Sequence, residues 1–291
     1  MALAELCAII ESAVGSRGAA LMGVVNTTPD SFFDGGRYAS EDAARARVDA
    51  LVALNTTILD IGGESTRPGS EPVPAAEQIA RIDPALTRAV EHGALVSVDT
   101  TSAEVAEFAL ARGASIVNDV SCLADPAIAE VAARHDAGLV LMHSRGPMSR
   151  MPGFSQWPED GYGDVVREVR EELGRARDAA LERGVRKDRL FVDPGLGFAK
   201  SARQSFELLR RLPELLSLGS ELVVGPSRKS FIASVDPVPP GERLGGTIAA
   251  CLVAVERGAK ILRVHDVRDV QQALAVHRSV RSRPEEAAHA R

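Results

Sequence analysis

Short apolar runs alternate with longer helical stretches eight times along this chain. The runs are rich in Val, Ile and Leu, as is typical of strands buried on both faces of a parallel sheet. We expect them at residues 20–25, 57–61, 95–98, 115–117, 139–142, 190–192, 222–224 and 260–264. Parallel strands that are each followed by a helix predict a wound α/β fold.

Helices are expected between these strands, and several of them end in a basic or polar residue followed by Gly, as at Arg112-Gly113. The expected helices cover residues 41–54, 75–91, 103–111, 127–135, 163–183, 203–211, 247–257 and 268–277. Eight such units in about 250 residues predict a closed (β/α)₈ TIM barrel, and an open doubly wound sheet is the alternative. No linker divides the chain, so we expect one domain. Residues 1–19 are taken as an N-terminal extension, 20–278 as the barrel and 279–291 as a polar tail.

Composition excludes several classes of protein. The net charge is -6 and aromatic residues make up 4% of the chain, which disfavours a nucleic-acid partner. No run of about 18 apolar residues predicts a membrane span, and the N-terminus lacks the pattern of a signal peptide. The scattered cysteines Cys7, Cys122 and Cys251 form no CxxC pair. They predict reduced thiols in a cytoplasmic protein.

Every predicted strand ends in polar residues. In a TIM barrel the active site lies at the carboxyl ends of the strands, so these side chains are the candidates for it. The strand ends carry Asn26, Asp60, Asp99, Asn118, Asp119, His143, Asp193, the loop 227–230, Arg263 and His265.

Two kinds of polar group divide the predicted mouth. The cations Arg67, Lys229, Arg263 and His265 fall there in an acidic protein, and the last expected helix begins directly afterwards, which predicts a phosphate or pyrophosphate site. The acceptors Asp99, Asn118 and Asp193 suit a flat heterocycle with N–H edges. No His pair has zinc-ligand spacing, and neither a P-loop nor a complete GxGxxG motif occurs.

The motifs at these strand ends resemble those of the dihydropteroate synthases. They occur in family order over residues 23–267, and together they are highly specific. The matching stretches are GVVNTTPDSFFDGG (23–36), DIGGESTRPG (60–69), SVDT (97–100), NDVS (118–121), LMH (141–143), DPGLGF (193–198), SRKS (227–230) and RVHDV (263–267).

The resemblance implies a transferase that joins 6-hydroxymethyl-7,8-dihydropterin pyrophosphate to p-aminobenzoate with Mg²⁺. It releases pyrophosphate and 7,8-dihydropteroate in folate biosynthesis, and sulfonamides inhibit it by mimicking p-aminobenzoate. The pterin-binding residues implied are Asp99, Asn118, Met142, Asp193 and Lys229. Those for pyrophosphate are Asn26, Thr66, Arg263 and His265, with Asn26 also on the metal. Those for p-aminobenzoate are Phe32, Thr66, Arg67, Pro68, Phe198 and Ser230. The catalytic residues implied are Asp34, Arg67 and Lys229.

Two other functions share such a barrel. Methyltransferase domains that bind methyltetrahydrofolate have no p-aminobenzoate pocket and no pyrophosphate site, so Thr66-Arg67-Pro68 and the SRKS stretch argue against them here. A paralogue could also bind pterin without making pteroate, because the fold alone does not fix the activity. The family resemblance further implies a homodimer. The loop 146–163, with Met148, Met151, Phe154 and Trp157, is unusual and has no function assigned by the resemblance.

Overall fold

Eight parallel strands form a closed barrel in this computed structural model, which describes residues 3–28, 41–65 and 69–281. The strands follow one another in chain order, and β8 closes the barrel against β1. Their bounds are β1 Ala20–Asn26, β2 Ile58–Gly62, β3 Val96–Asp99, β4 Ile116–Asp119, β5 Gly138–Met142, β6 Leu190–Asp193, β7 Glu221–Val224 and β8 Ala259–Val264. The prediction of a (β/α)₈ barrel is confirmed, and the open sheet is excluded.

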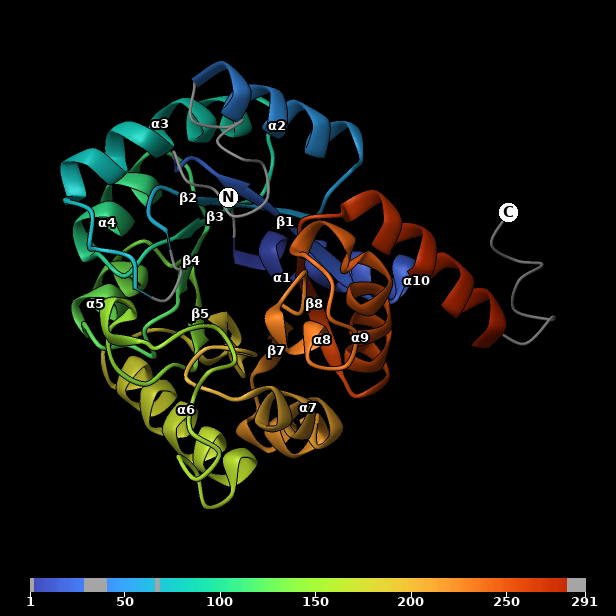
Figure 1. The fold of residues 1–291 in the computed structure, drawn as a ribbon. Coiled ribbons are helices and arrows are strands. Elements are labelled where there is room, and N and C mark those ends of the chain that lie inside the picture. The colour runs from blue at the N-terminus through green and yellow to red at the C-terminus, as the bar shows by residue number, and fades with distance from the viewer. Residues whose placement is uncertain (1–2, 29–40, 66–68, 282–291) are drawn as a thin grey trace.

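Helices surround the barrel (Figure 1). The α-helices are α1 Leu3–Arg17, α2 Glu41–Ala53, α3 Ala75–Glu91, α4 Ala103–Ala111, α5 Ala127–Arg134, α6 Val165–Glu182, α7 Ala202–Arg210, α8 Ser230–Ala233, α9 Leu244–Glu256 and α10 Val267–Arg281. Short 3₁₀ helices lie at η1 Met148–Arg150, η2 Lys187–Arg189, η3 Leu212–Leu218 and η4 Pro240–Glu242. No described helix is both long and apolar enough to span a membrane. Helix α10 runs past residue 278, where we set the end of the barrel.

Side-chain caps fix where several outer helices begin. Ser102 accepts a hydrogen bond from the Val105 backbone N–H at the start of α4. Asp164 accepts two such bonds at the start of α6. Ser201 and Gln204 form a reciprocal capping box on α7. Each cap satisfies backbone donors that have no partner inside the helix.

Helix α1 covers the amino-terminal end of the barrel. Leu6 and Ile10 are buried in one apolar cluster with residues that begin the strands, among them Met22, Ile58 and Ile116. This helix lies within residues 1–19, for which the sequence analysis expected no element. The described part of that extension therefore closes the end of the barrel opposite the predicted mouth.

Helix α9 begins earlier than expected, at Leu244 rather than at residue 247. The Gly245-Gly246 pair lies in the first turn of the helix. A Cβ atom at Gly246 would lie 2.4 Å from Cγ2 of Ile232. The close approach of α8 therefore requires glycine at position 246, where any larger residue would collide with Ile232.

Candidate active site

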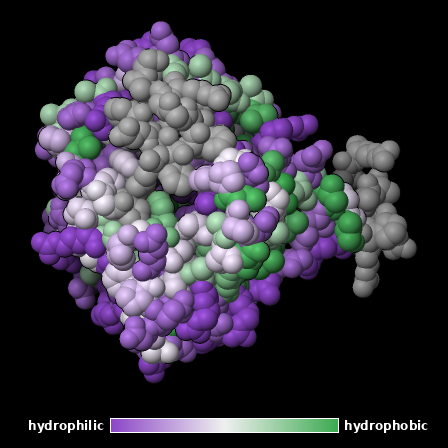
Figure 2. All heavy atoms as spheres, in the orientation of Figure 1, coloured by the Kyte–Doolittle hydropathy of each residue, from purple (hydrophilic) through white to green (hydrophobic). Residues whose placement is uncertain are grey.

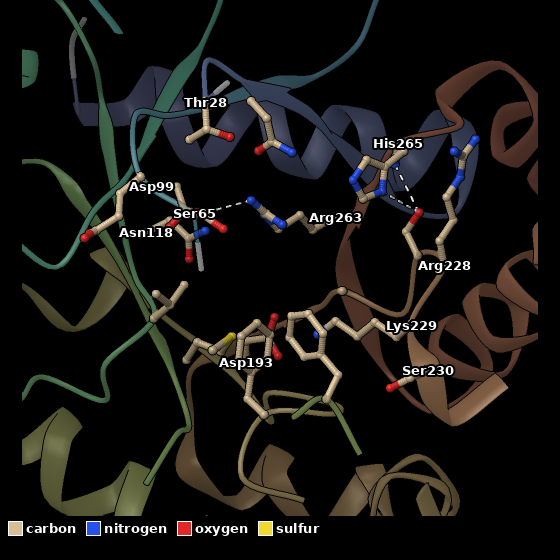
Figure 3. A pocket seen from close by; sticks show the side chains of 18 residues that line it. Thr28, Ser65, Asp99, Asn118, Asp193, Arg228, Lys229, Ser230, Arg263 and His265 are labelled. Atoms are coloured by element: carbon tan, nitrogen blue, oxygen red, sulfur yellow. Dashed lines mark hydrogen bonds and ion pairs between the residues drawn. The ribbon is translucent and has the colours of Figure 1, made fainter. Parts of the chain in front are cut away.

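A cavity opens among the carboxyl ends of the strands, on the side predicted for the active site. Its empty space is about 940 Å³, including the open mouth. It is lined by Asn26, Thr28, Glu64, Ser65, Asp99, Asn118, Val120, Met142, Phe154, Asp193, Phe198, Gly225, Ser227, Arg228, Lys229, Ser230, Arg263 and His265. Figure 3 shows Asp99, Asn118 and Arg263 on one side, facing Asp193, Lys229 and Ser230 on the other.

Strand register places the acceptor side chains in neighbouring positions. Asp99 pairs with Asn118 between β3 and β4, and Met142 pairs with Asp193 between β5 and β6. Because paired residues of parallel strands project to the same face, each pair enters the cavity together. The same alternation turns the next residues outward. Asp119 accepts backbone bonds from Ser121 and Leu123 instead.

His143 also faces away from the cavity, although the sequence analysis placed it at the mouth. Its Nε2 lies 3.0 Å from a Glu172 carboxylate oxygen on α6, and its Nδ1 lies 2.8 Å from Nζ of Lys200. Burial first, and then the nearby Lys200 charge, lower the His143 pKa to about 3. His143 is therefore a neutral structural residue behind the barrel wall. The reason is again alternation, since Met142 is the residue of β5 that points inward.

Arg263 on β8 is held between two buried carboxylates. Its Nε lies 2.6 Å from Oδ2 of Asp60, and its Nη2 lies 2.7 Å from Oδ2 of Asp99. Burial alone would lower the Arg263 pKa, but the two carboxylates outweigh it and raise the pKa above its ordinary value. Burial also raises the pKa of Asp99, against the opposing effect of Arg263. Asp60 was predicted only as a strand-end residue, and the structure adds its partner Arg263.

Lys229 lies across the cavity beside Asp193. Its Nζ donates to the Leu196 carbonyl oxygen at 2.6 Å and lies 4.4 Å from the centre of the Phe198 ring. Burial lowers the Lys229 pKa to about 8, although the Asp193 carboxylate favours the charged form. Burial correspondingly raises the pKa of Asp193, against the effect of Lys229. The ammonium therefore loses its proton close to neutral pH more readily than an exposed lysine would.

His265 is a neutral ring, not the cation that the sequence analysis expected. Burial, followed by the charges of Arg263 and Arg228, lowers its pKa to about 3. Ser227 Oγ accepts the His265 backbone N–H at 3.2 Å and lies 3.0 Å from Nδ1. When the Ser227 hydroxyl donates to Nδ1, the neutral ring carries its proton on Nε2. His265 can then donate a hydrogen bond into the cavity without carrying a charge.

The loop after β7 is fixed from several sides. Arg228 has a φ of +58°, which is uncommon for a residue with a side chain. Its guanidinium pairs with Asp266, and its backbone N–H donates to Thr247 Oγ1 at 2.9 Å. Arg243 in turn donates to the Arg228 carbonyl oxygen at 3.0 Å. These contacts offset the local strain and position Lys229 and Ser230.

The structure brings most of the predicted site residues together. Ten of them line the cavity, namely Asn26, Asp99, Asn118, Met142, Asp193, Phe198, Lys229, Ser230, Arg263 and His265. The predicted residues Phe32, Asp34, Thr66, Arg67 and Pro68 lie outside the described residues. Ser227 and Phe154 line the cavity without having been given a role. Ser227 stood inside the quoted SRKS stretch, whereas no motif pointed to Phe154.

Comparisons with known proteins agree with this cavity. The family described as "Pterin binding enzyme" matches residues 22–265. A dihydropteroate synthase of Synechocystis sp. is 44% identical over 259 residues, which is 88% of each chain. The solved dihydropteroate synthase of Xanthomonas albilineans with 4-aminobenzoic acid has a TM-score of 0.83 at 40% identity, covering 91% of this chain and 94% of that one.

A second solved structure is that of the Yersinia pestis dihydropteroate synthase with a sulfonamide drug. It has a TM-score of 0.85 at 34% identity and covers 92% of this chain and 96% of that one. These relatives span nearly the whole chain and share its barrel. This chain therefore belongs to the dihydropteroate synthase family of pterin-binding transferases.

Proposed function

We propose that the cavity condenses 6-hydroxymethyl-7,8-dihydropterin pyrophosphate with p-aminobenzoate, giving 7,8-dihydropteroate and pyrophosphate. The observation that carries the proposal is that buried acceptors and cations converge on one cavity, with Asp99 paired to Arg263 on one side and Asp193 beside Lys229 on the other. The acceptors Asp99, Asn118 and Asp193 lie deep in it, and the donors Lys229 and Arg263 lie on facing walls. A ligand that joins an N–H-rich ring to an anion fits this arrangement.

The pterin ring is assigned to the deep end. Asp99, Asn118 and Asp193 are almost fully buried there, so a ligand has to supply the hydrogen bonds that water would otherwise make. One oxygen of Asp99, Oδ1, is buried without a partner among the described residues. Met142 offers an apolar contact to the ring, and Lys229 donates to its polar edge.

The pyrophosphate is assigned to Asn26, Thr66, Arg263 and His265. Arg263 supplies the charge, and the neutral His265 supplies a hydrogen bond from Nε2. Helix α10 begins at Val267, just after His265, so its N-terminal end adds a favourable dipole. Such fixed donors stabilise the charge that develops on the leaving group.

The arylamine is assigned to Phe32, Thr66, Arg67, Pro68, Phe198 and Ser230. The described members, Phe198 and Ser230, line the cavity next to Lys229. The Xanthomonas albilineans relative with 4-aminobenzoic acid supports an arylamine at this site. Of the proposed catalytic residues, Asp34 would stabilise positive charge at the reacting carbon, and Arg67 and Lys229 would orient the substrates.

The reaction proceeds by loss of the leaving group. The C–O bond to pyrophosphate breaks first, which leaves positive charge on the carbon attached to the pterin ring. The aniline nitrogen then forms the new C–N bond, and its proton passes to the departing pyrophosphate or to water. Aniline is already a competent nucleophile, so no activated Ser or Cys is required. The enzyme lowers the barrier by electrostatic stabilisation and by positioning the two substrates.

Magnesium fits this site as an ion shared with the substrate. Mg²⁺ usually keeps several waters and takes one or two protein oxygens together with phosphate oxygens. The Asn26 amide at the end of β1 offers such an oxygen at the cavity wall. No group of three or more His, Cys, Asp or Glu side chains converges within the described residues. When bound, Mg²⁺ would neutralise charge on the pyrophosphate.

A coupled pyrophosphate-release assay tests the proposed function. Pyrophosphate should appear only when the pterin pyrophosphate, p-aminobenzoate and Mg²⁺ are all present, and 7,8-dihydropteroate should form in equal amount. A paralogue that only binds pterin would bind the ligand and release nothing. A methyltransferase would require methyltetrahydrofolate instead.

Sulfonamides should inhibit competitively with p-aminobenzoate, as the Yersinia pestis drug complex suggests. We expect Pro68→Leu to raise the inhibition constant of the drug more than the KM for p-aminobenzoate, because only the drug extends beyond the substrate. Inhibition constants measured against KM decide this. Turnover that continues at saturating sulfonamide would remove the loop 66–68 from the arylamine site.

A homodimer and a cytoplasmic location complete the proposal. Figure 2 shows hydrophobic side chains on the side of the molecule where α9 and α10 lie. Val276 and Val280 on α10 are 62% and 80% exposed, and residues four apart lie on one face of a helix. Exposed apolar patches of this kind favour association. The three cysteines are free in the structure, which suits a reducing compartment.

A further inference from the structure

The loop between β5 and α6 contributes to the cavity wall and contacts three other loops of the mouth. The Gly69 backbone N–H donates to the Met148 carbonyl oxygen at 2.8 Å. Ser155 donates its backbone N–H to the Gly197 carbonyl oxygen at 3.1 Å. Ser230 Oγ donates to Ser155 Oγ at 2.8 Å. The loop therefore contacts the segments after β2, β6 and β7, all of which contribute to the cavity.

Phe154 brings an aromatic ring from this loop into the cavity wall. Its ring meets the Phe198 ring edge-on, with 5.1 Å between the centres and an angle of 88°. This is a favourable geometry for two aromatic rings. Lys229 also contacts the Phe198 ring, with its Nζ 4.4 Å from the ring centre. Phe154 thus continues the apolar surface formed by Phe198 beside the reacting end of the site.

Several contacts fix the loop in this position. Ser155 has a φ of +60°, a strained conformation for a residue with a side chain. The Met151 sulfur accepts the Ala199 backbone N–H at 3.4 Å, and Tyr162 donates to the Ala199 carbonyl oxygen at 2.8 Å. Met151 is also buried in an apolar cluster with Phe198. Because the strain at Ser155 is maintained by these contacts, the position of Phe154 is well defined.

We propose that Phe154 is a specificity-determining residue of the arylamine subsite and that Ser155 is a positioning residue for Ser230. The proposal rests on the proposed function, because it takes the occupant to be a 4-aminobenzoate. A flat ring gains from an aromatic wall, and a rigid wall limits substituents on that ring. Phe154 contributes the wall, while the Ser155 hydroxyl orients the neighbouring Ser230 hydroxyl.

Phe154→Ala tests the wall. Loss of the aromatic contact should raise the KM for p-aminobenzoate about 3- to 10-fold. We expect kcat and the KM for the pterin pyrophosphate to stay within about twofold. For a 4-aminobenzoate with a bulky ring substituent, the KM should rise much less in Phe154→Ala, or should fall. Phe154→Leu retains apolar volume, so its KM for p-aminobenzoate should lie between those of the wild type and Phe154→Ala.

Phe206→Ala is the matched control. Phe206 forms the same edge-on pair with Phe231, with 5.2 Å between the centres and an angle of 87°, but it does not line the cavity. It should leave both KM values unchanged. An unchanged KM for p-aminobenzoate in Phe154→Ala, or equal increases in KM for both substrates, would overturn the role of Phe154 in the arylamine subsite. A wild-type protein that releases no pyrophosphate would instead overturn the proposed function.

Ser155→Gly and Ser155→Ala test the positioning role. Both remove the hydroxyl, but glycine accepts a positive φ without strain whereas alanine does not. If the hydroxyl orients Ser230, both variants should raise the KM for p-aminobenzoate alone, and Ser155→Gly should keep its Tm. A rise in KM that appears only in Ser155→Ala, together with a lower Tm, would reduce Ser155 to a structural residue and overturn its role.

Discussion

Arg263 is positioned before any ligand arrives, because Asp60 and Asp99 hold two of its nitrogens. An isolated buried arginine would be costly, and the two carboxylates offset that cost. The guanidinium therefore needs no reorganisation to meet an anion, which is the condition for effective electrostatic stabilisation. Asp99 also faces the proposed pterin site, so the Arg263–Asp99 ion pair joins the proposed pterin and pyrophosphate subsites.

Replacing Arg263 should distinguish the binding of the pyrophosphate group from the binding of the pterin ring. We expect Arg263→Ala to weaken binding of the pterin pyrophosphate by about 1.5–3 kcal/mol more than binding of the bare pterin, because a charge-assisted contact is lost. Calorimetry with both ligands measures the difference. Arg263→Lys is the matched variant, since it keeps a charge beside Asp60 and Asp99. Equal losses for both ligands would remove Arg263 from the anion site.

Lys229 should give the reaction an alkaline limit. Burial lowers its pKa to about 8, so raising the pH through that value removes the charge and weakens its contact to the pterin. We expect kcat/KM for the pterin pyrophosphate to fall above pH about 8 with loss of one proton. Lys229→Arg retains its charge and should move this fall to higher pH. A profile that is flat from pH about 7 to 10 in the wild type would contradict the role.

Helix α1 is the element that closes the amino-terminal end of the barrel. Its buried residues Leu6, Ile10 and Ala13 pack against the beginnings of the strands, while the ten candidate site residues that line the cavity lie at the opposite end. Stability and chemistry are therefore placed at different ends of the same strands, as is usual in TIM barrels. A change in α1 should therefore affect the stability of the barrel without affecting ligand binding in the cavity.

Leu6→Ala should lower the free energy of unfolding by about 2–4 kcal/mol, because it leaves a cavity in a packed cluster. Leu6 is 1% exposed. Pterin affinity per folded molecule should not change, which a titration beside a denaturant melt can establish. Ser12→Ala, on an exposed position of the same helix, should leave both quantities unchanged. A loss of affinity in folded Leu6→Ala would mean that the two ends of the barrel are coupled.

The elements show which parts of the fold the sequence could predict. The eight strands were predictable because each is an apolar run buried on both faces. Helix α1 was missed, although Leu6, Ile10 and Ala13 recur at helical spacing, because apolar residues cover most of its circumference and conceal that face. The sequence showed that the strand ends are polar, but it did not show which of these side chains point into the barrel. Asn118 and Met142 point inward while Asp119 and His143 point outward, and only the register decides this.

At the scale of the whole molecule, contacts between distant segments decide what the sequence could not reveal. Phe154 belongs to the cavity because its loop is tied to residues far along the chain, such as Gly197 and Ser230. No local pattern contains those pairings. The neutral state of His265 has the same origin, since burial in the closed barrel lowers its pKa and the charges of Arg263 and Arg228 lower it further. Motif matching identified the residue, and the closed fold determines its charge.

The assembly of two chains is the last property to test at this scale. Val276 and Val280 lie on one face of α10 and are largely exposed, so the proposed dimer should bury them. We expect the wild type to sediment as two chains and the Val276→Asp/Val280→Asp double variant as one, because two charges would be desolvated in the interface. Both side chains face solvent in the single chain, so Tm at low protein concentration should change little. Val235→Asp, at an exposed valine outside α10, is the matched control and should remain dimeric. A wild type that sediments as one chain at all concentrations, or a double variant that still pairs, would place the interface elsewhere or remove it.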